Sequence, residues 1–251
     1  MSESPAQAPD ITDDAILDGR LRLLQPRRGH RFGHDAVLLA AAVPAQPGER
    51  IAEFGAGVGA AGLALASRVP DIDLILYEID PRLCALAEEN VVRNNFAGRA
   101  HVTAQDVASL SPTRDVNHVL MNPPFNSARL QPSPDPDRRS AHQANPGLLA
   151  EWTRAARNVL RDGGTLTLIW RAEGLAEVTA ALSDGFGAIT LLPVYPAPRR
   201  LANRVIVNAH KGAVSPLRIL PPLLLNGSDL RPTPEAESIL RQGSALIVAQ
   251  A

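Results

Sequence analysis

The stretch RIAEFGAGVGAAGLALASR at residues 50–68 combines an apolar run, a turn with glycine at every second position, and an alanine- and leucine-rich continuation. The run Arg50–Phe54 is typical of a buried strand, and the continuation from Gly59 is typical of a helix. The glycines between them let the backbone turn sharply and approach a ligand closely. The start of a helix also leaves N–H groups that face such a turn. The stretch therefore predicts a strand, a ligand-binding turn and a helix.

Strand-like and helix-like segments continue to alternate beyond this stretch. That alternation predicts an α/β fold of βαβ units, a sheet of seven mostly parallel strands with helices on both faces. Strands are expected at Arg50–Phe54, Asp73–Glu78, Ala100–Ala104, Val116–Met121, Thr165–Trp170, Ala188–Tyr195 and Asn203–His210. Helices are expected to start near Gly59, Pro81, Pro146 and Glu173.

Local signals mark several of these boundaries. Asp80 before Pro81 and Asn145 before Pro146 each place a capping side chain ahead of a proline at the first helical position. The run from Arg161 to Gly164 predicts a helix stop. Only a proline-rich connection separates the last two strands, so they are expected to form an antiparallel hairpin at one edge of the sheet.

The segments on either side of the sheet are expected to belong to the same domain. Residues 1–14 are interpreted as a flexible tail, and residues 15–251 as a single domain. Within it we distinguish an N-terminal extension at 15–48, a core at 49–212 and a C-terminal appendage at 213–251. The extension should hold a short strand near Arg20–Leu24 and a helix near Asp35–Val43, and the appendage should hold the run Pro216–Leu225 and a helix opened by Thr233–Pro234.

The composition excludes several classes of protein. The chain has 251 residues, 45% of them hydrophobic, and a formal net charge of -1, which argues against coating nucleic acid by bulk charge. The single cysteine, Cys84, rules out an intrachain disulfide framework and a cysteine-rich zinc site. No apolar run approaches the roughly 18 residues of a membrane span. A cytoplasmic protein without metal or membrane partner is expected, and a monomer is slightly favoured.

Acidic residues stand at the ends of three successive strands. Glu53 precedes the glycine turn, Glu78 ends the second strand, and Asp106 follows the third. Because the carboxyl ends of parallel strands meet at one crevice, these carboxylates should converge on one ligand. Glu78 is placed where a carboxylate can accept hydrogen bonds from ribose hydroxyls, and Asp106 could accept from an adenine amine or be a solvated loop acid. Asp80 is assigned to the helix cap rather than to the ligand.

The turn Asn122-Pro123-Pro124-Phe125 directly follows the fourth strand. Two prolines stiffen the turn and hold its carbonyl groups still. The side-chain oxygen of Asn122 and the backbone oxygen of Pro123 could accept both N–H groups of a planar amine or amide, and so aim its nitrogen lone pair at an electrophilic methyl group. Phe125 could stack on that planar acceptor. Catalysis would then rest on orientation and fixed dipoles.

Together these motifs resemble those of Rossmann-like class I methyltransferases that use S-adenosylmethionine to methylate amino groups. The greatest similarity is to the family that methylates N6 of adenosine 37 in a valine tRNA. The resemblance rests on residues 32–44, 55–68, the Asn122 turn, Arg138–His142 and Ala202–Val207. Phe54 is one departure, since leucine is more usual there.

The resemblance implies an antiparallel last strand, S-adenosylmethionine as the cofactor and tRNA as the partner. It implies a catalytic role for Asn122, Pro123 and Phe125. Cofactor-binding residues are then expected to be Glu53, Gly55, Gly57, Gly59, Glu78, Asp106 and Asn122.

Contact with the RNA backbone is expected at arginines. The stretch Arg20–His34 holds five arginines and no acid, which suits phosphate contact. The expected RNA-binding residues are Arg27, Arg28, Arg31, Arg138, Arg139, Arg199 and Arg200.

Two other functions remain open. One is glutamine N5 methylation of a release-factor-type protein, which uses a similar turn but usually has a larger helical domain ahead of the glycine turn. The other is a non-catalytic RNA-binding protein that keeps the fold.

Overall fold

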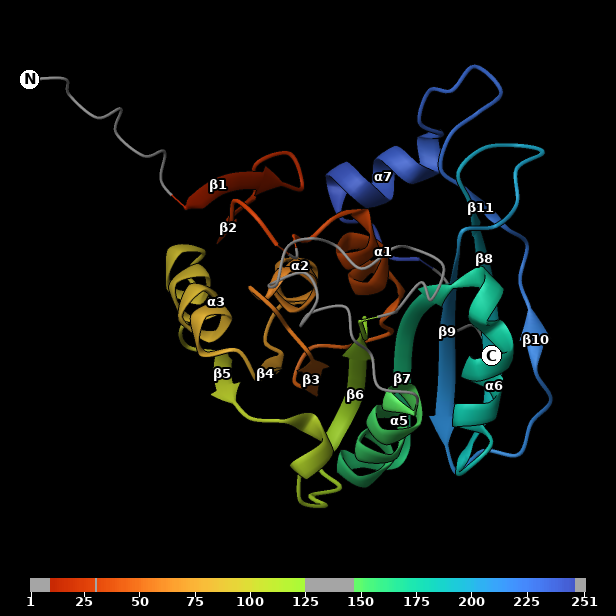
Figure 1. Cartoon of the computed structure of the whole chain (residues 1–251), viewed down its shortest axis with the longest axis horizontal. Helices are drawn as coiled ribbons and strands as arrows, with labels where there is room; N and C mark the ends of the chain where they lie inside the picture. The colour runs from red at the N-terminus through yellow and green to blue at the C-terminus, as the bar shows by residue number, and fades with distance from the viewer. Residues whose placement is uncertain (1–9, 30, 125–146, 247–251) are drawn as a thin grey trace, which may run out of the picture.

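The strand that leads into the glycine turn lies inside a mixed sheet (Figure 1). A computed structural model describes residues 10–29, 31–124 and 147–246. The strand order is β10-β8-β9-β7-β6-β3-β4-β5, with β11 also paired to β8. Strands β3 to β7 are mutually parallel, and β9 runs antiparallel to both β7 and β8. The expected α/β fold with an antiparallel last strand is confirmed.

All seven expected strands are present. They are β3 (Arg50–Phe54), β4 (Asp73–Glu78), β5 (Ala100–Ala104), β6 (Val116–Met121), β7 (Leu160–Arg171), β8 (Phe186–Tyr195) and β9 (Arg204–Lys211). Two further two-residue strands, β10 (Arg218–Ile219) and β11 (Leu223–Leu224), pair in parallel with β8 and bring the sheet to nine strands. The expected hairpin exists, but it does not form the sheet edge, because the C-terminal segment covers β8.

The helices are α1 (His34–Ala42), α2 (Ala60–Arg68), α3 (Pro81–Arg93), α5 (Leu148–Val159), α6 (Leu175–Leu182) and α7 (Pro234–Gln242), with short 3₁₀ turns η1 (Val107–Ser109) and η2 (Ala172–Gly174). Asp80 caps α3 by accepting from the Arg82 N–H at 2.8 Å, as predicted. Helix α5 starts at Leu148 after Gly147, two residues later than expected, while Asn145 and Pro146 lie outside the described residues. The helix stop expected at Arg161–Gly164 is placed too late, because α5 ends at Val159 and β7 already begins at Leu160.

The four residues from Arg161 to Gly164 form an irregularity in β7. Val116 pairs with Leu160, whereas His118, two residues on, pairs with Thr165. The extra residues of β7 therefore bulge out of the ladder, which accounts for glycines inside a strand.

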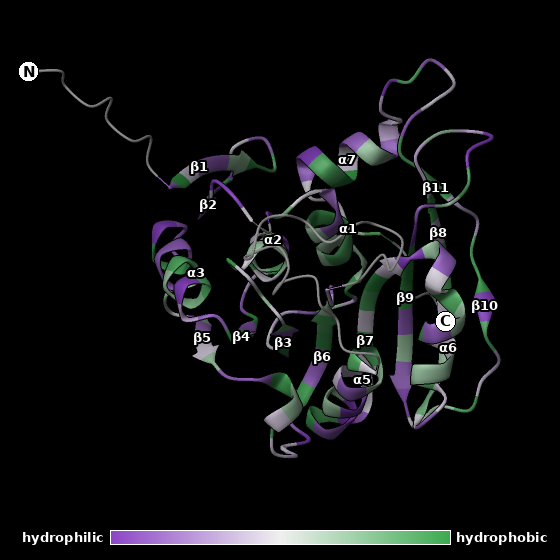
Figure 2. Ribbon diagram, viewed as in Figure 1, coloured by the Kyte–Doolittle hydropathy of each residue, from purple (hydrophilic) through white to green (hydrophobic). Residues whose placement is uncertain are grey.

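Two hydrophobic clusters lie on the two faces of the sheet. Successive residues of β3 and β6 alternate between them: Ile51 and Leu120 pack with α1 and α2, whereas Ala52 and Val119 pack with α5 and α6. This period of two is what a sheet covered on both faces requires. Figure 2 shows the corresponding hydrophobic colour along the central strands.

The N-terminal extension contains a hairpin of β1 (Ile11–Ile16) and β2 (Leu21–Pro26). The expected tail boundary at residue 14 is wrong, because residues 11–14 belong to β1; residues 1–9 lie outside the described residues. Strand β1 was missed because two acids interrupt its apolar pattern, and pairing with β2 supplies the stabilisation that the local sequence lacks. Among the helices that the structure describes, none is long and apolar enough to cross a membrane.

Candidate active site

A cleft of about 1300 Å³ opens at the carboxyl ends of the central strands. Its lining comes from the glycine turn after β3, the ends of β4 and β6, the turn after β5, helix α5 and the N-terminal extension. The sheet order places β4 and β5 on one side of β3 and places β6, β7 and β9 on the other. The expected site residues at these strand ends therefore line one cavity: Glu53, Gly55, Gly57, Glu78, Asp106, Asn122 and Pro123.

The glycine turn adopts a conformation that other residues rarely take. Gly55, Gly57 and Gly59 have φ angles of 64°, 58° and 84°, which lie in the left-handed region. A Cβ on Gly55 would overlap the ring of Trp152, and one on Gly59 would lie 3.1 Å from Leu76 Cδ1. A Cβ on Gly57 would meet nothing within 4 Å. Gly57 lines the cleft, so the space beside it is available to a ligand.

Glu53 is buried beneath the turn and has a structural contact. Its Oε2 accepts the Gly62 N–H at 2.7 Å, which satisfies an N–H group in the first turn of α2. Burial raises the pKa of Glu53 to about 8, and the nearby Glu78 carboxylate adds to this, while the bond from Gly62 opposes it. Glu53 lines the cleft, but its described contact holds the helix to the sheet.

Glu78 is joined to the glycine turn and to its own loop. One carboxylate oxygen accepts the Gly57 N–H at 2.7 Å, and the other accepts the N–H groups of Ile79 and Asp80 at 2.8 and 2.9 Å. A carboxylate has about four acceptor positions, so these three bonds leave little capacity. A ribose diol can be bound fully only if one hydroxyl shares or replaces one of these donors.

Asp106, in the turn after β5, also lines the cleft. Its Oδ1 accepts the Ala108 N–H at 2.9 Å and caps η1. Ile79 lines the cleft although its apolar side chain is 66% exposed. An exposed aliphatic residue between acids suits the face of a planar base, and the sequence reading did not select it.

Asn122 lies at the carboxyl end of β6, beside Pro123 and Pro124. Its Oδ1 is buried, and no residue in the described part of the chain donates a hydrogen bond to it. An unsatisfied buried acceptor costs about 1–3 kcal/mol, so this oxygen is suited to a donor on a ligand. Phe125, expected to stack on the acceptor, lies outside the described residues.

Three aromatic residues pack together, and two of them line the cleft. Phe54 is fully buried and contacts Tyr77 and Trp152 edge-on, with ring centroids 5.9 and 6.5 Å apart. Tyr77 and Trp152 line the cleft. The aromatic residue at position 54 therefore packs with both. The sequence gives no sign that Trp152 belongs to the site, because Trp152 is far from Gly55 along the chain and contacts it only in the folded structure.

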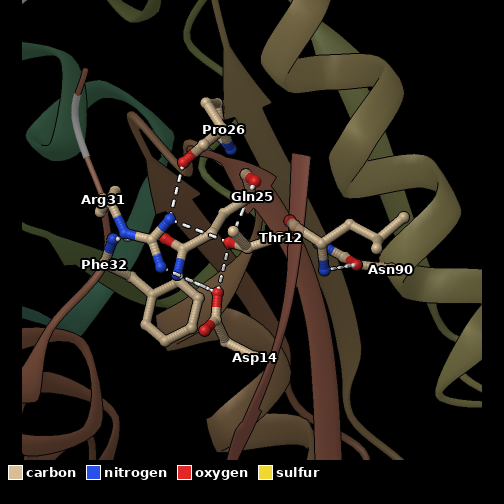
Figure 3. Close-up of polar contacts among 8 residues, drawn as sticks. Thr12, Asp14, Gln25, Pro26, Arg31, Phe32 and Asn90 are labelled. Carbon is tan, nitrogen blue, oxygen red and sulfur yellow. Dashed lines mark hydrogen bonds and ion pairs between the residues drawn. The ribbon is translucent and has the colours of Figure 1, made fainter. Parts of the chain in front are cut away.

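The expected RNA-binding arginines are not brought together in the described structure. Arg28 and Arg31 line the cleft, and Arg27 is exposed next to them. The Arg31 guanidinium donates to Thr12 Oγ1, the Pro26 carbonyl and Asp14 Oδ2, each at 2.9 Å, so its contacts hold the hairpin (Figure 3). Arg199 and Arg200 are exposed in the β8–β9 turn and do not line the cleft, and Arg138 and Arg139 lie outside the described residues.

An ion pair that the sequence reading missed also lines the cleft. Arg204 Nε at the start of β9 lies 2.8 Å from Asp35 Oδ2 in the first turn of α1. It joins the N-terminal extension to the last core strand. Within residues 10–29, 31–124 and 147–246, no group of three or more potential metal ligands is present.

Comparison with known proteins gives three consistent similarities. A family profile described as methyltransferase small domain matches residues 30–193. A Bacteroides thetaiotaomicron protein named tRNA1(Val) (adenine(37)-N6)-methyltransferase is 29% identical over 61% of this chain. The Erwinia tasmaniensis protein of the same name is 28% identical over 79% of this chain and 82% of its own length. The chain spans 65% of the Bacteroides relative, slightly less than two thirds.

A solved structure extends the similarity to the fold. A crystal structure described as a predicted O-methyltransferase from Agrobacterium tumefaciens has a TM-score of 0.73 and 29% identity, and it covers 86% of this chain and 100% of its own. Its description names an oxygen as the methyl acceptor, whereas the names of the tRNA relatives give a nitrogen.

Proposed function

The chain belongs to the methyltransferase small domain family, and from that premise we propose that it transfers the methyl group of S-adenosylmethionine to N6 of an adenosine in tRNA. The observation that carries the proposal is the buried Oδ1 of Asn122, which has no donor among the described residues. Position 37 of a valine tRNA is the proposed target, by similarity to the named relatives. Acting on tRNA, the enzyme would work in the cytoplasm as a monomer.

The residues around the glycine turn fit the methyl donor. The open space beside Gly57 admits a ligand close to the backbone, and Glu78 supplies carboxylate oxygens for ribose hydroxyls. Ile79 and Asp106 provide an apolar face and an acceptor for an adenine ring. When bound, the donor supplies an electrophilic methyl group on a positively charged sulfur.

The Asn122 turn fits an NH₂ acceptor better than a hydroxyl. A planar NH₂ group presents two N–H donors, which the Asn122 and Pro123 oxygens would accept together, whereas a hydroxyl presents one. Holding both N–H groups orients the nitrogen lone pair toward the donor and needs no strong base. The proton that the nitrogen carries in excess after transfer is released to water. On this ground N-methylation is favoured over the O-methylation in the name of the Agrobacterium protein.

The test is one set of incubations with S-adenosylmethionine labelled in the methyl group. A valine tRNA transcript, the same transcript with guanosine at position 37, and an RNA-free protein fraction are offered in parallel, followed by nucleoside and amino-acid analysis. Label in N6-methyladenosine from the first transcript alone supports the proposal. Label in a glutamine side chain would identify a protein methyltransferase, label in a methylated hydroxyl would overturn the assigned chemistry, and no transfer to any fraction would favour the non-catalytic alternative.

A further inference from the structure

Two asparagine side chains, one on α3 and one at its C-terminal end, hold the N-terminal hairpin. They form hydrogen bonds with the backbone of β2 as a neighbouring strand would. Asn90 accepts the Leu24 N–H at 2.7 Å and donates to the Leu24 carbonyl at 2.9 Å. Asn94 makes the same pair of bonds with Arg22, at 3.0 and 2.9 Å. The side-chain amides thus occupy backbone groups on one edge of β2.

The spacing of the two elements makes this match possible. Residues four apart on a helix rise about 6 Å along its axis, and residues two apart on a strand are separated by about 6.6 Å. Asn90 and Asn94 therefore face Leu24 and Arg22 in register. A side-chain amide also carries the same donor and acceptor types as a peptide group. Each asparagine can therefore pair with both the N–H and the carbonyl group of one β2 residue.

The two asparagines differ in one bond. Asn90 Nδ2 also donates to the carbonyl of Val58 at 3.0 Å, and Val58 stands between Gly57 and Gly59 in the glycine turn. Asn94 Nδ2 instead donates to the carbonyl of Asn90 in its own helix, at 2.8 Å. Asn90 is 0% exposed and does not line the cleft. Its contact with the turn is therefore buried and lies outside the cleft lining.

Strand β2 connects this contact to another wall of the cleft. Gln25, next to Leu24, is buried, and its Oε1 accepts the Phe32 N–H at 3.1 Å while its Nε2 donates to Asp14 Oδ2 at 2.8 Å. Phe32 lines the cleft. Figure 3 shows this network and Asn90 on the two sides of the hairpin. The hairpin thus joins the glycine turn to the segment that carries Phe32.

We infer that Asn90 is a positioning residue that holds the glycine turn, through Val58, in the conformation that binds the methyl donor. The inference rests on the proposed function, because it concerns the affinity for that donor. Asn90 itself does not line the cleft, so it would act without touching the ligand. Its effect comes from fixing the Val58 carbonyl, while the Gly57 N–H is fixed from the other side by Glu78. A turn held at two of its peptide groups, with one peptide group between them, needs little rearrangement on binding.

The test compares Asn90→Asp with Asn94→Asp. Each change keeps an acceptor for the β2 N–H and removes both amide donors, but only the first removes a bond to the glycine turn. Calorimetry with S-adenosylhomocysteine should show affinity about tenfold weaker for Asn90→Asp and within about twofold of the natural protein for Asn94→Asp. Once an RNA that the enzyme methylates is identified, Asn90→Asp should raise KM for S-adenosylmethionine and change kcat less. The melting temperatures of both variants should fall, because each loses a hydrogen bond between α3 and β2.

The outcomes separate the inference from the proposed function. If the natural protein binds neither S-adenosylmethionine nor S-adenosylhomocysteine, the proposed function fails. If it binds and the two variants weaken binding equally, Asn90 acts only through the hairpin and the inference is overturned.

If the variants do not fold, hydrogen exchange of the natural protein decides. S-Adenosylhomocysteine should then slow exchange at the Leu24 amide, which Asn90 holds, more than at the Arg22 amide, which Asn94 holds. Equal protection at both amides would overturn the inference.

Discussion

The Glu78 carboxylate accepts a hydrogen bond from the Gly57 N–H across 2.7 Å, so the end of β4 and the glycine turn are joined within the protein itself. The same carboxylate also accepts two N–H groups of its own loop. Its position is therefore set by three backbone donors. Such an arrangement spares a ligand the cost of ordering the side chain.

Replacing Glu78 by alanine should weaken binding of the methyl donor. The variant loses a charge-assisted contact to ribose, of about 1.5–3 kcal/mol, and also frees the Gly57 N–H. We expect calorimetry with S-adenosylhomocysteine to show a dissociation constant larger by a factor on the order of 10 to 100. Glu88→Ala, which removes an exposed carboxylate on α3, the helix that follows Glu78, should leave the constant unchanged. Equal affinity in the two variants would refute the assignment of Glu78.

Gly57→Ala should also weaken donor binding, for a different reason. The φ angle of 58° makes alanine strained there by about 1 kcal/mol, and its methyl group would enter space that a ligand needs. Gly48 is the matched control, since it has a φ of 83°, open space around it and no place in the cleft lining. Both variants should lose similar stability in urea unfolding, while only Gly57→Ala loses affinity.

The strand and helix pattern of the core was predictable because each buried element is locally apolar and bounded by a cap or a turn. Asp80 with Pro81 and the glycines after Phe54 carry these signals in adjacent residues. The strands β1, β10 and β11 were not predictable in the same way. Strands β10 and β11 have only two residues each and depend on β8, which is distant in sequence. Strand β1 pairs with its neighbour β2, but two acids interrupt its apolar pattern, so its own sequence does not indicate a strand.

The strand-end positions of the site followed from topology, but the contacts of each side chain did not. The sequence placed Glu53, Glu78 and Asp106 at one crevice, and in the structure all three line one cleft, while their binding roles stay predictions. It did not indicate that Glu53 accepts from α2 or that Arg31 is held by Asp14. The sequence of a basic segment does not show which acid will pair with an arginine such as Arg31, because that acid lies on another strand and comes close only on folding.

Glu53 should give the protein a pH-dependent stability that Glu53→Gln lacks. Its pKa is about 8 when folded and near the ordinary 4.5 when unfolded. Between these values the folded state holds one more proton than the unfolded state, so the free energy of unfolding falls as pH rises, by up to about 1.4 kcal/mol per unit. Below about pH 4.5 and above about pH 8 the contribution of Glu53 to the free energy of unfolding no longer changes with pH. Urea unfolding from about pH 4 to about pH 9 spans this window, and parallel curves for the two proteins would contradict the assignment.

Asn122→Ala should lower turnover with little effect on donor affinity. Removing one preorganised acceptor for the reacting NH₂ group is expected to reduce kcat by on the order of 100-fold. Asn117→Ala is the control at the other end of β6, where the asparagine accepts the Arg50 N–H at 3.0 Å, far from the cleft lining. It should cost stability but change kcat little. Full activity of Asn122→Ala would remove the basis of the proposed chemistry.

The exposed arginines before α1 should differ from Arg31 in how they affect tRNA binding. Arg27 and Arg28 are exposed, so Arg27→Ala/Arg28→Ala should weaken binding and reduce the slope of log K against log salt by about 0.7 to 0.9 for each phosphate group that the variant no longer neutralises. Arg31 donates to Thr12, Pro26 and Asp14 and so holds the hairpin together, so Arg31→Ala should lower the melting temperature and leave that slope unchanged. Filter binding of tRNA between about 50 and 200 mM salt, a range that changes phosphate-dominated affinities strongly, measures both slopes. A reduced slope in Arg31→Ala with an unchanged melting temperature would mean that its guanidinium leaves the hairpin to bind phosphate.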